Sequence, residues 1–340
     1  MEALLVEKIP EGRDWLYEPK WDGFRCLVFR DHDAVEFQSK SGQPLARYFP
    51  EVVDDVRLIA ATRFVLDCEV VIPVGDALSF EELLMRIHPA ESRIRKLARE
   101  RPALLIAFDL LEEQGRLLTL APLRDRRQAL ERFFSRSLGT AGRIRLSPTT
   151  SDSRVARDWL QSPNSSLDGI VAKRADLPYQ SGERTGMQKV KLIRSADCVV
   201  GGFRYGTGSK LVGSLLLGLY DHDGRLNHVG FTSGIQSKAK PQLTGELEAM
   251  IKPPGFTGRA PGGPSRWSTE RSAEWQPVEP RLVVEVAYNH FSGGRFRHGT
   301  KLLRWRPDKH PHQCLMGQVE MSNAAALDLL ESRTERGPAR

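Results

Sequence analysis

Chemistry-bearing side chains are densest in the run Glu18-Pro-Lys20-Trp-Asp22-Gly-Phe-Arg25. A lysine amine is a nucleophile only when it is deprotonated, so a nucleophilic lysine needs surroundings that lower its pKa. Neighbouring cations or a metal ion have that effect. The run therefore predicts covalent catalysis at Lys20, and a charged turn ahead of a strand is the alternative interpretation.

Further charged and aromatic residues follow Lys20 in an ordered series along the chain. Each segment has an ordinary structural interpretation, because a phenylalanine is usually core and paired lysines usually lie on an exposed strand face. Their occurrence together favours one shared functional site. The segments are Ser39–Gly42 with Lys40, Leu66–Val71 with Glu69, Phe108–Leu111, Asp168–Lys173, Lys189–Lys191 and Arg306–Lys309.

These residues fall on elements whose periodicity is visible in the sequence. Apolar residues alternate through residues 17–40, which predicts a hairpin with an Asp-rich turn. Ser79 precedes a helical pattern and Glu82 follows three residues later, which predicts an N-capped helix. The other predictions for this part are strands at 64–72, 104–111, 169–173 and 188–192 and helices at 79–87, 122–134 and 151–160.

The pattern changes after about residue 197, where short strands alternate with Gly and Asp-Gly turns. Several short strands with one helix are typical of a small barrel such as an OB-fold. The sequence therefore predicts an α+β chain, with a mixed domain over residues 1–194 and an OB-fold β-barrel domain over residues 195–340. Predicted here are strands at 199–205, 215–220, 227–232 and 282–288, a helix at 240–251 and a Gly- and Pro-rich loop at 253–264.

Composition limits the class of protein. A chain of 340 residues suffices for about two domains, and its formal net charge of +7 fits a polyanionic partner such as nucleic acid. The four cysteines form no CxxC pair, which favours reduced thiols over a disulfide framework or a zinc ribbon. No signal peptide or membrane span is visible. We therefore expect a soluble, cytoplasmic protein with no membrane partner.

The ordered segments resemble the motif series shared by the covalent nucleotidyltransferases, namely DNA ligases, RNA ligases and capping enzymes. Three phrases, Tyr17–Arg25, Phe108–Leu111 and Arg304–Lys309, look most like the stand-alone bacterial ATP-dependent DNA ligases of the C type. The resemblance implies a nucleotidyltransferase (ATP-grasp-like ligase) domain followed by an OB-fold domain. It also implies sealing of 3′-OH/5′-phosphate nicks in duplex DNA through a lysine–AMP intermediate, in DNA repair or end-joining.

The resemblance implies a role for each matching residue around the nucleoside. Lys20 would carry AMP, and Glu18 would meet the adenine edge, largely through its backbone. Phe108 would stack on adenine, where an aromatic face contributes roughly 1–3 kcal/mol. Glu69 would bind the ribose hydroxyl or a metal ion, and Arg25 would contact the ribose or the nick end.

Other matching residues would serve the phosphates and a metal ion. Lys189 and Lys191 would stabilise charge on the α-phosphate. Asp168, with Glu69, would hold Mg²⁺ or Mn²⁺, because hard cations prefer oxygen ligands. Three positions depart from the family pattern. Asp168 stands where Glu is usual, and Lys40 stands where Arg is usual, so a bidentate phosphate contact is lost there. Met187 stands where the family often has an aromatic residue before the paired lysines.

The resemblance places the last group of residues on the second domain. Arg306, Asp308 and Lys309 would approach ATP to orient the leaving pyrophosphate and would withdraw for DNA sealing. Such movement predicts a hinge near residues 195–197. Asp22, in the first domain, would lie near the reacting 3′ end.

Cofactor and partners follow from the same comparison. Only 19 residues precede Lys20, whereas nicotinamide-dependent ligases need an extra N-terminal domain, so ATP is the expected cofactor. Nicked double-stranded DNA is the expected partner, and salt should weaken its binding. A Ku-type or other repair partner and a monomeric, nucleoid-associated bacterial protein are further expectations. We also expect Arg266, Trp267 and Arg271, in the segment 253–275, to contact the DNA backbone.

Two other functions stay open at this point. An RNA ligase or a capping-type guanylyltransferase would share the motifs, although a barrel carrying Arg306–Lys309 favours the DNA or capping branch. A nucleic-acid-binding OB-fold protein with an inactive first domain is the non-enzyme alternative. The intact Lys20 and Glu69 speak against it. Ligation of nicked DNA and nicked RNA–DNA hybrids with ATP, GTP or NAD would separate these functions.

Overall fold

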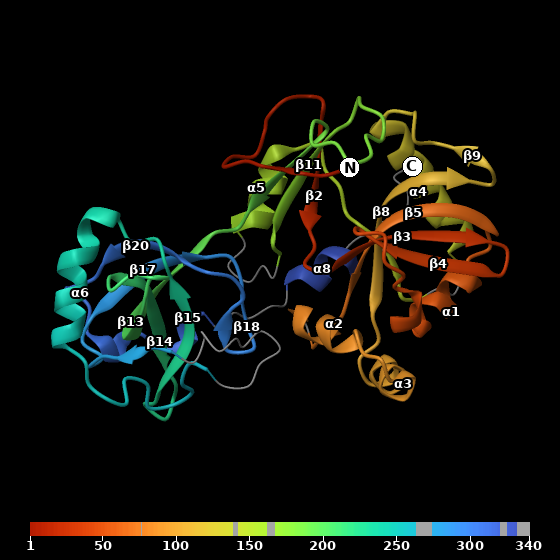
Figure 1. Ribbon diagram of the computed structural model, residues 1–340. Coiled ribbons are helices and arrows are strands. Elements are labelled where there is room, and N and C mark those ends of the chain that lie inside the picture. Colours follow the sequence, from red (N-terminus) through yellow and green to blue (C-terminus); the bar gives the residue numbers. More distant parts are fainter. Residues whose placement is uncertain (76, 139–141, 162–166, 263–273, 320–324, 332–340) are drawn as a thin grey trace. The chain divides into compact units, whose positions relative to one another are not determined.

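The chain forms two compact units (Figure 1). The computed structural model describes residues 1–75, 77–138, 142–161, 167–262, 274–319 and 325–331. One unit consists of Met1–Leu192 with Ser322–Arg340, and the other of Ile193–Met321. The sequence analysis placed everything after residue 194 in the second domain. The C-terminal segment instead belongs to the first unit, because its helix packs into a core there.

A six-stranded sheet dominates the first unit. Its strand order is β10-β8-β5-β3-β4, with β9 paired to β8. All pairings are antiparallel except that of β10 with β8. The strands are β3 (Phe24–Asp31), β4 (Ala34–Ser39), β5 (Arg63–Val71), β8 (Leu104–Glu113), β9 (Arg116–Leu117) and β10 (Ile144–Leu146). The predicted hairpin and the predicted strands at 64–72 and 104–111 are therefore present.

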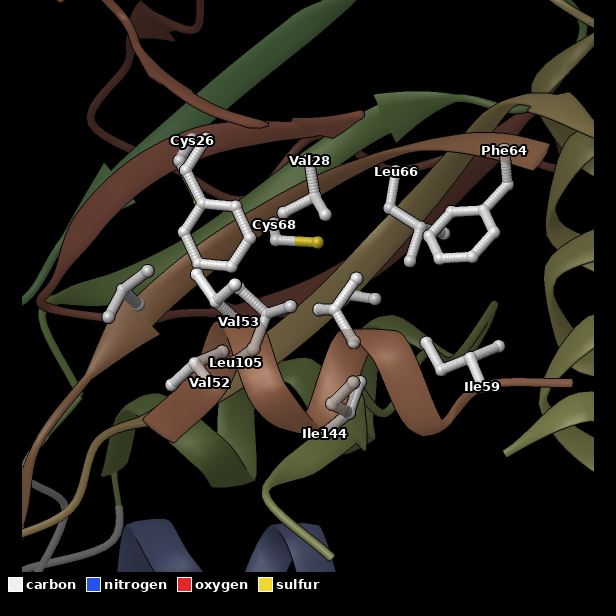
Figure 2. Close-up of a cluster of buried hydrophobic side chains, with 14 of the residues drawn as sticks. Cys26, Val28, Val52, Val53, Ile59, Phe64, Leu66, Cys68, Leu105 and Ile144 are labelled. Carbon is white, nitrogen blue, oxygen red and sulfur yellow. The ribbon is translucent and has the colours of Figure 1, made fainter. Parts of the chain in front are cut away.

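Two helices, α1 (Pro50–Leu58) and α4 (Leu123–Ser137), share one core with this sheet. Figure 2 shows Val52 and Val53 of α1 beneath Cys68 and Leu66 of β5. A fully buried aliphatic side chain contributes roughly 1.5–3 kcal/mol relative to an exposed one, so this cluster holds the sheet and its edge strands together. The short helix η1 (Ala46–Tyr48) leads into α1.

A second, four-stranded sheet carries Lys20 and the paired lysines Lys189 and Lys191. Its order is β1-β12-β11-β2, formed by Leu4–Leu5, Met187–Lys191, Gly169–Arg174 and Trp15–Lys20. Helix α5 (Ser153–Gln161) packs on it through Ala156. Gly169 has φ +145°, and a Cβ there would lie 2.0 Å from the Val190 carbonyl oxygen, so only glycine lets β11 and β12 approach this closely.

A small apolar cluster joins the chain's C-terminal helix to the first unit. Helix α8 (Ala325–Glu331) buries Leu330 against Trp21, Val71 and Ile106. The neighbouring elements are β6 (Pro73–Val74), β7 (Ala77–Leu78), α2 (Phe80–Arg86) and α3 (Glu91–Glu100). The Ser79 hydroxyl accepts a hydrogen bond from the Glu82 amide at 3.3 Å, which confirms the predicted cap of α2.

The second unit is an antiparallel sheet closed on itself. The strand order is β15-β14-β13-β17-β20, with β16 paired to β13. An isolated parallel bridge joins Thr232, at the end of β15, to Thr300, just before β20. The Thr232 hydroxyl donates to the Thr300 carbonyl oxygen at 3.0 Å. First and last strands thus meet, as the predicted OB-fold barrel requires.

The predicted elements of this unit are present with different ends: β13, β14 and β15 are longer than predicted, and β17 and α6 are shorter. Helix α6 spans Lys240–Ala249, within the predicted helical segment. The strands are β13 (Arg194–Tyr205), β14 (Val212–Tyr220), β15 (Leu226–Thr232), β16 (Gln276–Pro277), β17 (Val283–Tyr288), β18 (Phe291–Ser292), β19 (Arg295–Phe296) and β20 (Lys301–Trp305). Short helices η2 (Ser237–Ala239), η3 (Pro311–Gln313) and η4 (Met316–Gln318) complete it.

Two expectations are not tested by the described structure. Residues 195–197 lie inside β13 and pair with β17, and the units divide close by, at Leu192 and Ile193; the hinge stays a prediction. The expected DNA contacts of Arg266, Trp267 and Arg271 fall outside the described residues. In the part of the chain that the structure covers, every helix is too short or too polar to cross a membrane.

Candidate active site

Lys20 is the last residue of β2, where the two sheets of the first unit approach each other. Its Nζ forms an ion pair with the buried carboxylate of Asp168. The backbone reinforces this pairing, since the Asp168 amide donates to the Lys20 carbonyl oxygen at 3.0 Å. Both residues are thereby fixed at the β2–β11 junction.

The Lys20 side chain opens into a cavity of about 220 Å³. Seven residues that the sequence analysis selected come together in its wall, although they are far apart along the chain. Asp22, Asp168 and Lys191 flank the wall without lining it. The seven are Glu18, Lys20, Arg25, Lys40, Glu69, Phe108 and Lys189.

One end of the cavity combines an aromatic ring with a buried ion pair. Lys173 Nζ lies 2.9 Å from a Glu18 carboxylate oxygen, and both side chains are buried. The same ammonium group lies 4.4 Å from the centroid of the Phe108 ring. A desolvated cation over a ring adds a favourable interaction. This end therefore offers a flat aromatic surface beside a charged hydrogen-bonding pair.

The sequence analysis did not select Lys173. A signal for it exists, because Val171 pairs with Glu18 in the β11–β2 register and Lys173 is the diagonal neighbour on the same face. The register of β11 against β2 had to be known before this diagonal could be recognised.

Glu69 occupies the opposite wall on β5, directly across from Arg25 on β3. Burial raises the pKa of Glu69 to about 8, and the charges of Lys20 and Arg25 only partly offset that effect. In the protein without ligands this carboxyl is therefore largely protonated at neutral pH. It would ionise readily when a further cation enters the cavity.

Arg25 is committed to a buried carboxylate. Its Nε and Nη2 atoms donate to Asp67 at 3.0 and 2.6 Å, and the Tyr179 hydroxyl donates to the same carboxylate at 2.8 Å. Burial alone would raise the pKa of Asp67, but these partners outweigh it and hold that pKa below its usual value. Arg25 thus lines the cavity while Asp67 holds its guanidinium group in place.

A cationic end of the cavity lies around Lys189 and Lys40. Burial and the nearby charges of Lys20 and Lys191 lower the pKa of Lys189. Lys40 Nζ lies 3.0 Å from Glu2, and Arg184 reaches the other oxygen of Glu2 at 3.0 Å. These cations hold the pKa of Glu2 at about 2. Glu2 also lines the cavity, and nothing in its sequence context indicated this.

Arg306, Asp308 and Lys309 lie in the other unit, in the turn that follows β20. Arg306 donates from Nε and Nη2 to the two oxygens of Asp308 at 3.0 and 2.9 Å, and this contact lowers the pKa of Asp308 to about 2. The turn borders a groove of about 580 Å³, which Arg306 and Lys309 help to line. They form a compact positive group at its edge.

The donor set around Lys20 suits a magnesium ion that is shared with a bound phosphate. Asp168 and Glu69 are the carboxylates beside the amine. The described residues include no cluster of three or more His, Cys, Asp or Glu side chains arranged for a metal. Mg²⁺ commonly takes one or two carboxylates and completes its shell with phosphate oxygens and water, so two carboxylates are sufficient.

A lysine beside an aromatic, carboxylate and cationic cavity, in a chain that also carries an OB-fold barrel, fits a nucleotidyltransferase-type ligase. Residues 4–191 match the family model described as ATP dependent DNA ligase domain, and residues 208–309 match that described as ATP dependent DNA ligase C terminal region. The chain therefore belongs to the ATP-dependent DNA ligases.

Individual relatives refine this assignment. The chain is 42% identical over 345 residues to DNA ligase C1 of Mycolicibacterium smegmatis, covering 98% of this chain and 97% of that protein. It is 29% identical over 315 residues to the multifunctional non-homologous end joining DNA repair protein LigD of Mycobacterium tuberculosis, covering 89% of this chain and 37% of that protein. The resemblance to stand-alone C-type ligases is thus confirmed.

A solved structure supports the fold. The structure described in a study of Lig E DNA ligases aligns with a TM-score of 0.53 at 14% identity, covering 90% of this chain and all of that one. Together, these comparisons favour a DNA ligase over the RNA ligase, the capping enzyme and the non-catalytic barrel protein.

Proposed function

We propose that the cavity around Lys20 binds ATP and that Lys20 becomes adenylylated before a nick in duplex DNA is sealed. The carrying observation is the convergence, around the partly buried Lys20 amine, of an aromatic and polar end at Phe108 and a cationic end at Lys189. A nucleoside and its phosphates need these two environments on opposite sides of the reacting lysine.

The reaction has three balanced steps. The neutral Lys20 amine attacks the α-phosphorus of ATP, a P–N bond forms, the nitrogen loses a proton, the bond to the β-phosphate oxygen breaks, and pyrophosphate leaves. A DNA 5′-phosphate oxygen then attacks the same phosphorus, the P–N bond breaks, and Lys20 leaves as its nitrogen takes up a proton. Finally the 3′-OH attacks the activated 5′-phosphate, loses its proton and displaces AMP. Lys189 and Lys191 would stabilise negative charge at the α-phosphate.

Adenine recognition would use the aromatic end. Stacking on Phe108 provides the affinity, at roughly 1–3 kcal/mol for an aromatic face. Glu18 and Lys173 provide an acceptor and a donor 2.9 Å apart, which suits the alternating donors and acceptors of a purine edge. Glu69 would accept a hydrogen bond from a ribose hydroxyl group. Arg25, held by Asp67, would reach the ribose or the nick end.

Mg²⁺ or Mn²⁺ would be held by Asp168 and Glu69. Such an ion neutralises phosphate charge and lowers the barrier for attack. Engagement of Asp168 by a cation would also loosen its hold on Lys20, which leaves the amine freer to lose its proton. Lys40 would release Glu2 and bind a phosphate of ATP instead. Asp22 would lie near the reacting 3′ end of the DNA.

The second unit would supply Arg306, Asp308 and Lys309 to the pyrophosphate side of ATP. A guanidinium and an ammonium group are the donors that phosphate oxygens bind best. The contact between Arg306 and Asp308 would keep the guanidinium plane in one orientation. This role belongs to lysine adenylylation alone, because pyrophosphate takes part in no later step.

The similarity to a protein named for non-homologous end joining supports a role in DNA repair. We further propose nicked double-stranded DNA as the substrate and a Ku-type protein as a partner. We propose a monomer in the bacterial cytoplasm, associated with the nucleoid. Joining of DNA ends in the presence and absence of a Ku-type protein tests the pathway, and sedimentation tests the monomer.

Labelling with α-labelled ATP tests the nucleophile. Wild-type protein with ATP and Mg²⁺ should gain one AMP by intact mass, and Lys20→Ala should gain none, because Lys20 is the cavity lysine that pairs with Asp168, whereas Lys173 pairs with Glu18 and Lys40 with Glu2. Lys8→Ala, at an exposed position in the same unit, is the matched control and should label normally. Persistent labelling of Lys20→Ala would overturn the assignment.

A further inference from the structure

A single carboxylate in the second unit holds both cations of the turn after β20. Asp197, on β13, accepts a hydrogen bond from Arg306 Nη1 on one oxygen at 2.8 Å. Its other oxygen accepts from Lys309 Nζ at 2.7 Å. The Asp197 side chain is 12% exposed, so these contacts are largely shielded from water. Asp197 therefore bridges two side chains that are three positions apart.

The backbone of Asp197 is held on both sides by the side chain of Gln318. The side-chain amide of Gln318 accepts from the Asp197 amide at 3.0 Å and donates to the Asp197 carbonyl oxygen at 2.9 Å. Asp197 also pairs with Glu285 in the antiparallel register of β13 and β17. A rigid strand thus carries the carboxylate, whereas its two partners are long side chains with many rotamers.

The N–H donors of Arg306 are shared between two carboxylates. Nε and Nη2 face Asp308, Nη1 faces Asp197, and Glu285 lies farther away at 4.0 Å. Lys309 has Asp197 as its acidic partner in the described residues. Removing the Asp197 charge would leave Arg306 with Asp308, but it would release Lys309.

We propose that Asp197 is a positioning residue for lysine adenylylation, which sets Arg306 and Lys309 side by side so that both meet the pyrophosphate side of ATP. The inference rests on the proposed role of these two cations. Preorganised charges stabilise a transition state without reorganisation at the moment of reaction, and misplaced ones lose much of that effect. Asp197 touches no reacting atom and acts only through its partners.

The opposite role for Asp197 is inhibition of adenylylation. A carboxylate that withholds Arg306 and Lys309 from ATP would slow adenylylation, so its removal would speed the reaction. The arrangement favours positioning, because the spare donors of both cations stay available. Arg306 is 18% and Lys309 is 25% exposed, and both line the open groove.

The test separates the chemical steps in the full-length protein. Enzyme freed of AMP with pyrophosphate is mixed with ATP and Mg²⁺, and formation of the AMP adduct is followed over an ATP titration. Sealing is followed separately on a nick that already carries 5′-adenylate, without ATP. Asp197→Asn keeps the size and the backbone contacts of the residue and removes its charge. We expect about a tenfold or larger loss of the adenylylation rate at saturating ATP, with sealing within about twofold of wild type.

Two further variants sharpen the result. Asp197→Glu, which restores the charge on a longer stem, should recover part of the lost rate. Glu279→Gln is the matched control in the same unit, since it removes a carboxylate that serves Lys252 at 3.0 Å, and its adenylylation should match wild type.

The outcomes decide between the inference and the function on which it rests. An unchanged or faster adenylylation rate in Asp197→Asn, or an equal loss in both steps, overturns the positioning role. Wild-type enzyme that forms no AMP adduct overturns the proposed function itself. Normal wild-type adenylylation with an unaffected Asp197→Asn overturns this inference alone.

Discussion

Glu69 illustrates how one residue balances stability against function. Its raised pKa of about 8 exceeds the usual carboxyl value, so the folded protein holds a proton that the unfolded chain releases near its ordinary pKa. Stability from this group is therefore present at low pH and is lost as pH rises toward 8. The protein therefore has this lower stability as long as no cation is bound beside Glu69.

We predict that Glu69→Gln becomes progressively more stable than wild type as pH rises from about 6 to about 9. The gain should be about 1–2 kcal/mol, a discounted figure because the residue lines an open cavity. Urea unfolding of ATP-free protein at both pH values measures it, and the variant should lose adenylylation despite its stability. A stability difference that does not vary with pH would show that the folded carboxyl is already ionised.

Residues that stand in a recognisable sequence motif were predictable. Residues that reach their partners only through the register of paired strands were not. Lys20, Glu69 and Phe108 stand in recognisable segments, and the cavity contains all three. Lys173 enters the site as a diagonal cross-strand neighbour of Glu18, and Asp197 meets its partners across more than a hundred positions of sequence. Such contacts depend on strand pairing, which local spacing does not specify.

Among the elements, β11 depends most strictly on one residue. Gly169 adjoins Asp168 and stands where β11 passes closest to β12. We predict that Gly169→Ala destabilises the protein by about 2–5 kcal/mol, because its φ of +145° is unfavourable for alanine and the new Cβ would meet the Val190 carbonyl oxygen. Chemical denaturation measures the loss, and adenylylation should fall with it.

Gly245 in α6 is the matched control. It lies inside a helix, and a Cβ there would meet no atom within 4 Å. Gly245→Ala should stabilise the protein by about 0.5–1 kcal/mol, because alanine has the higher helix propensity. Equal effects of the two substitutions would refute the steric argument for Gly169.

Sequence patterns identified elements with a clear period and missed those made by tertiary packing. The strands at 64–72 and 104–111 and the capped helix at 79–87 were predicted correctly. Helix α1 is rich in valine, which favours strands intrinsically, and its burial against the large sheet overrides that preference. Helix α8 is short, and Leu330 fixes it through residues that are far away in the sequence, such as Trp21, Val71 and Ile106.

At the scale of the whole molecule, two separate cores carry the two halves of the chemistry. Lys20 and its cavity belong to one unit, and Arg306 and Lys309 belong to the other. The sequence pattern changes near residue 197 from mixed helices and strands to mainly short strands, and this change predicted two domains with different folds. The return of the chain to the first unit was not foreseeable, because a single short apolar helix carries no mark of the core that it joins.

The net charge of +7 leads to a prediction about DNA binding. Lysine and arginine contacts to phosphates release condensed counterions, so affinity should fall linearly with salt on a double logarithmic scale. For about four phosphate contacts, affinity for nicked duplex DNA should fall about a hundredfold between about 50 and 200 mM salt. Anisotropy of labelled nicked DNA with AMP-loaded enzyme measures the slope. Intact duplex of the same length is the control, and its slope should be shallower if the nick adds phosphate contacts. Affinity that stays constant across this salt range would exclude a phosphate-dominated interface and shift the search for DNA contacts from the basic surface to apolar ones.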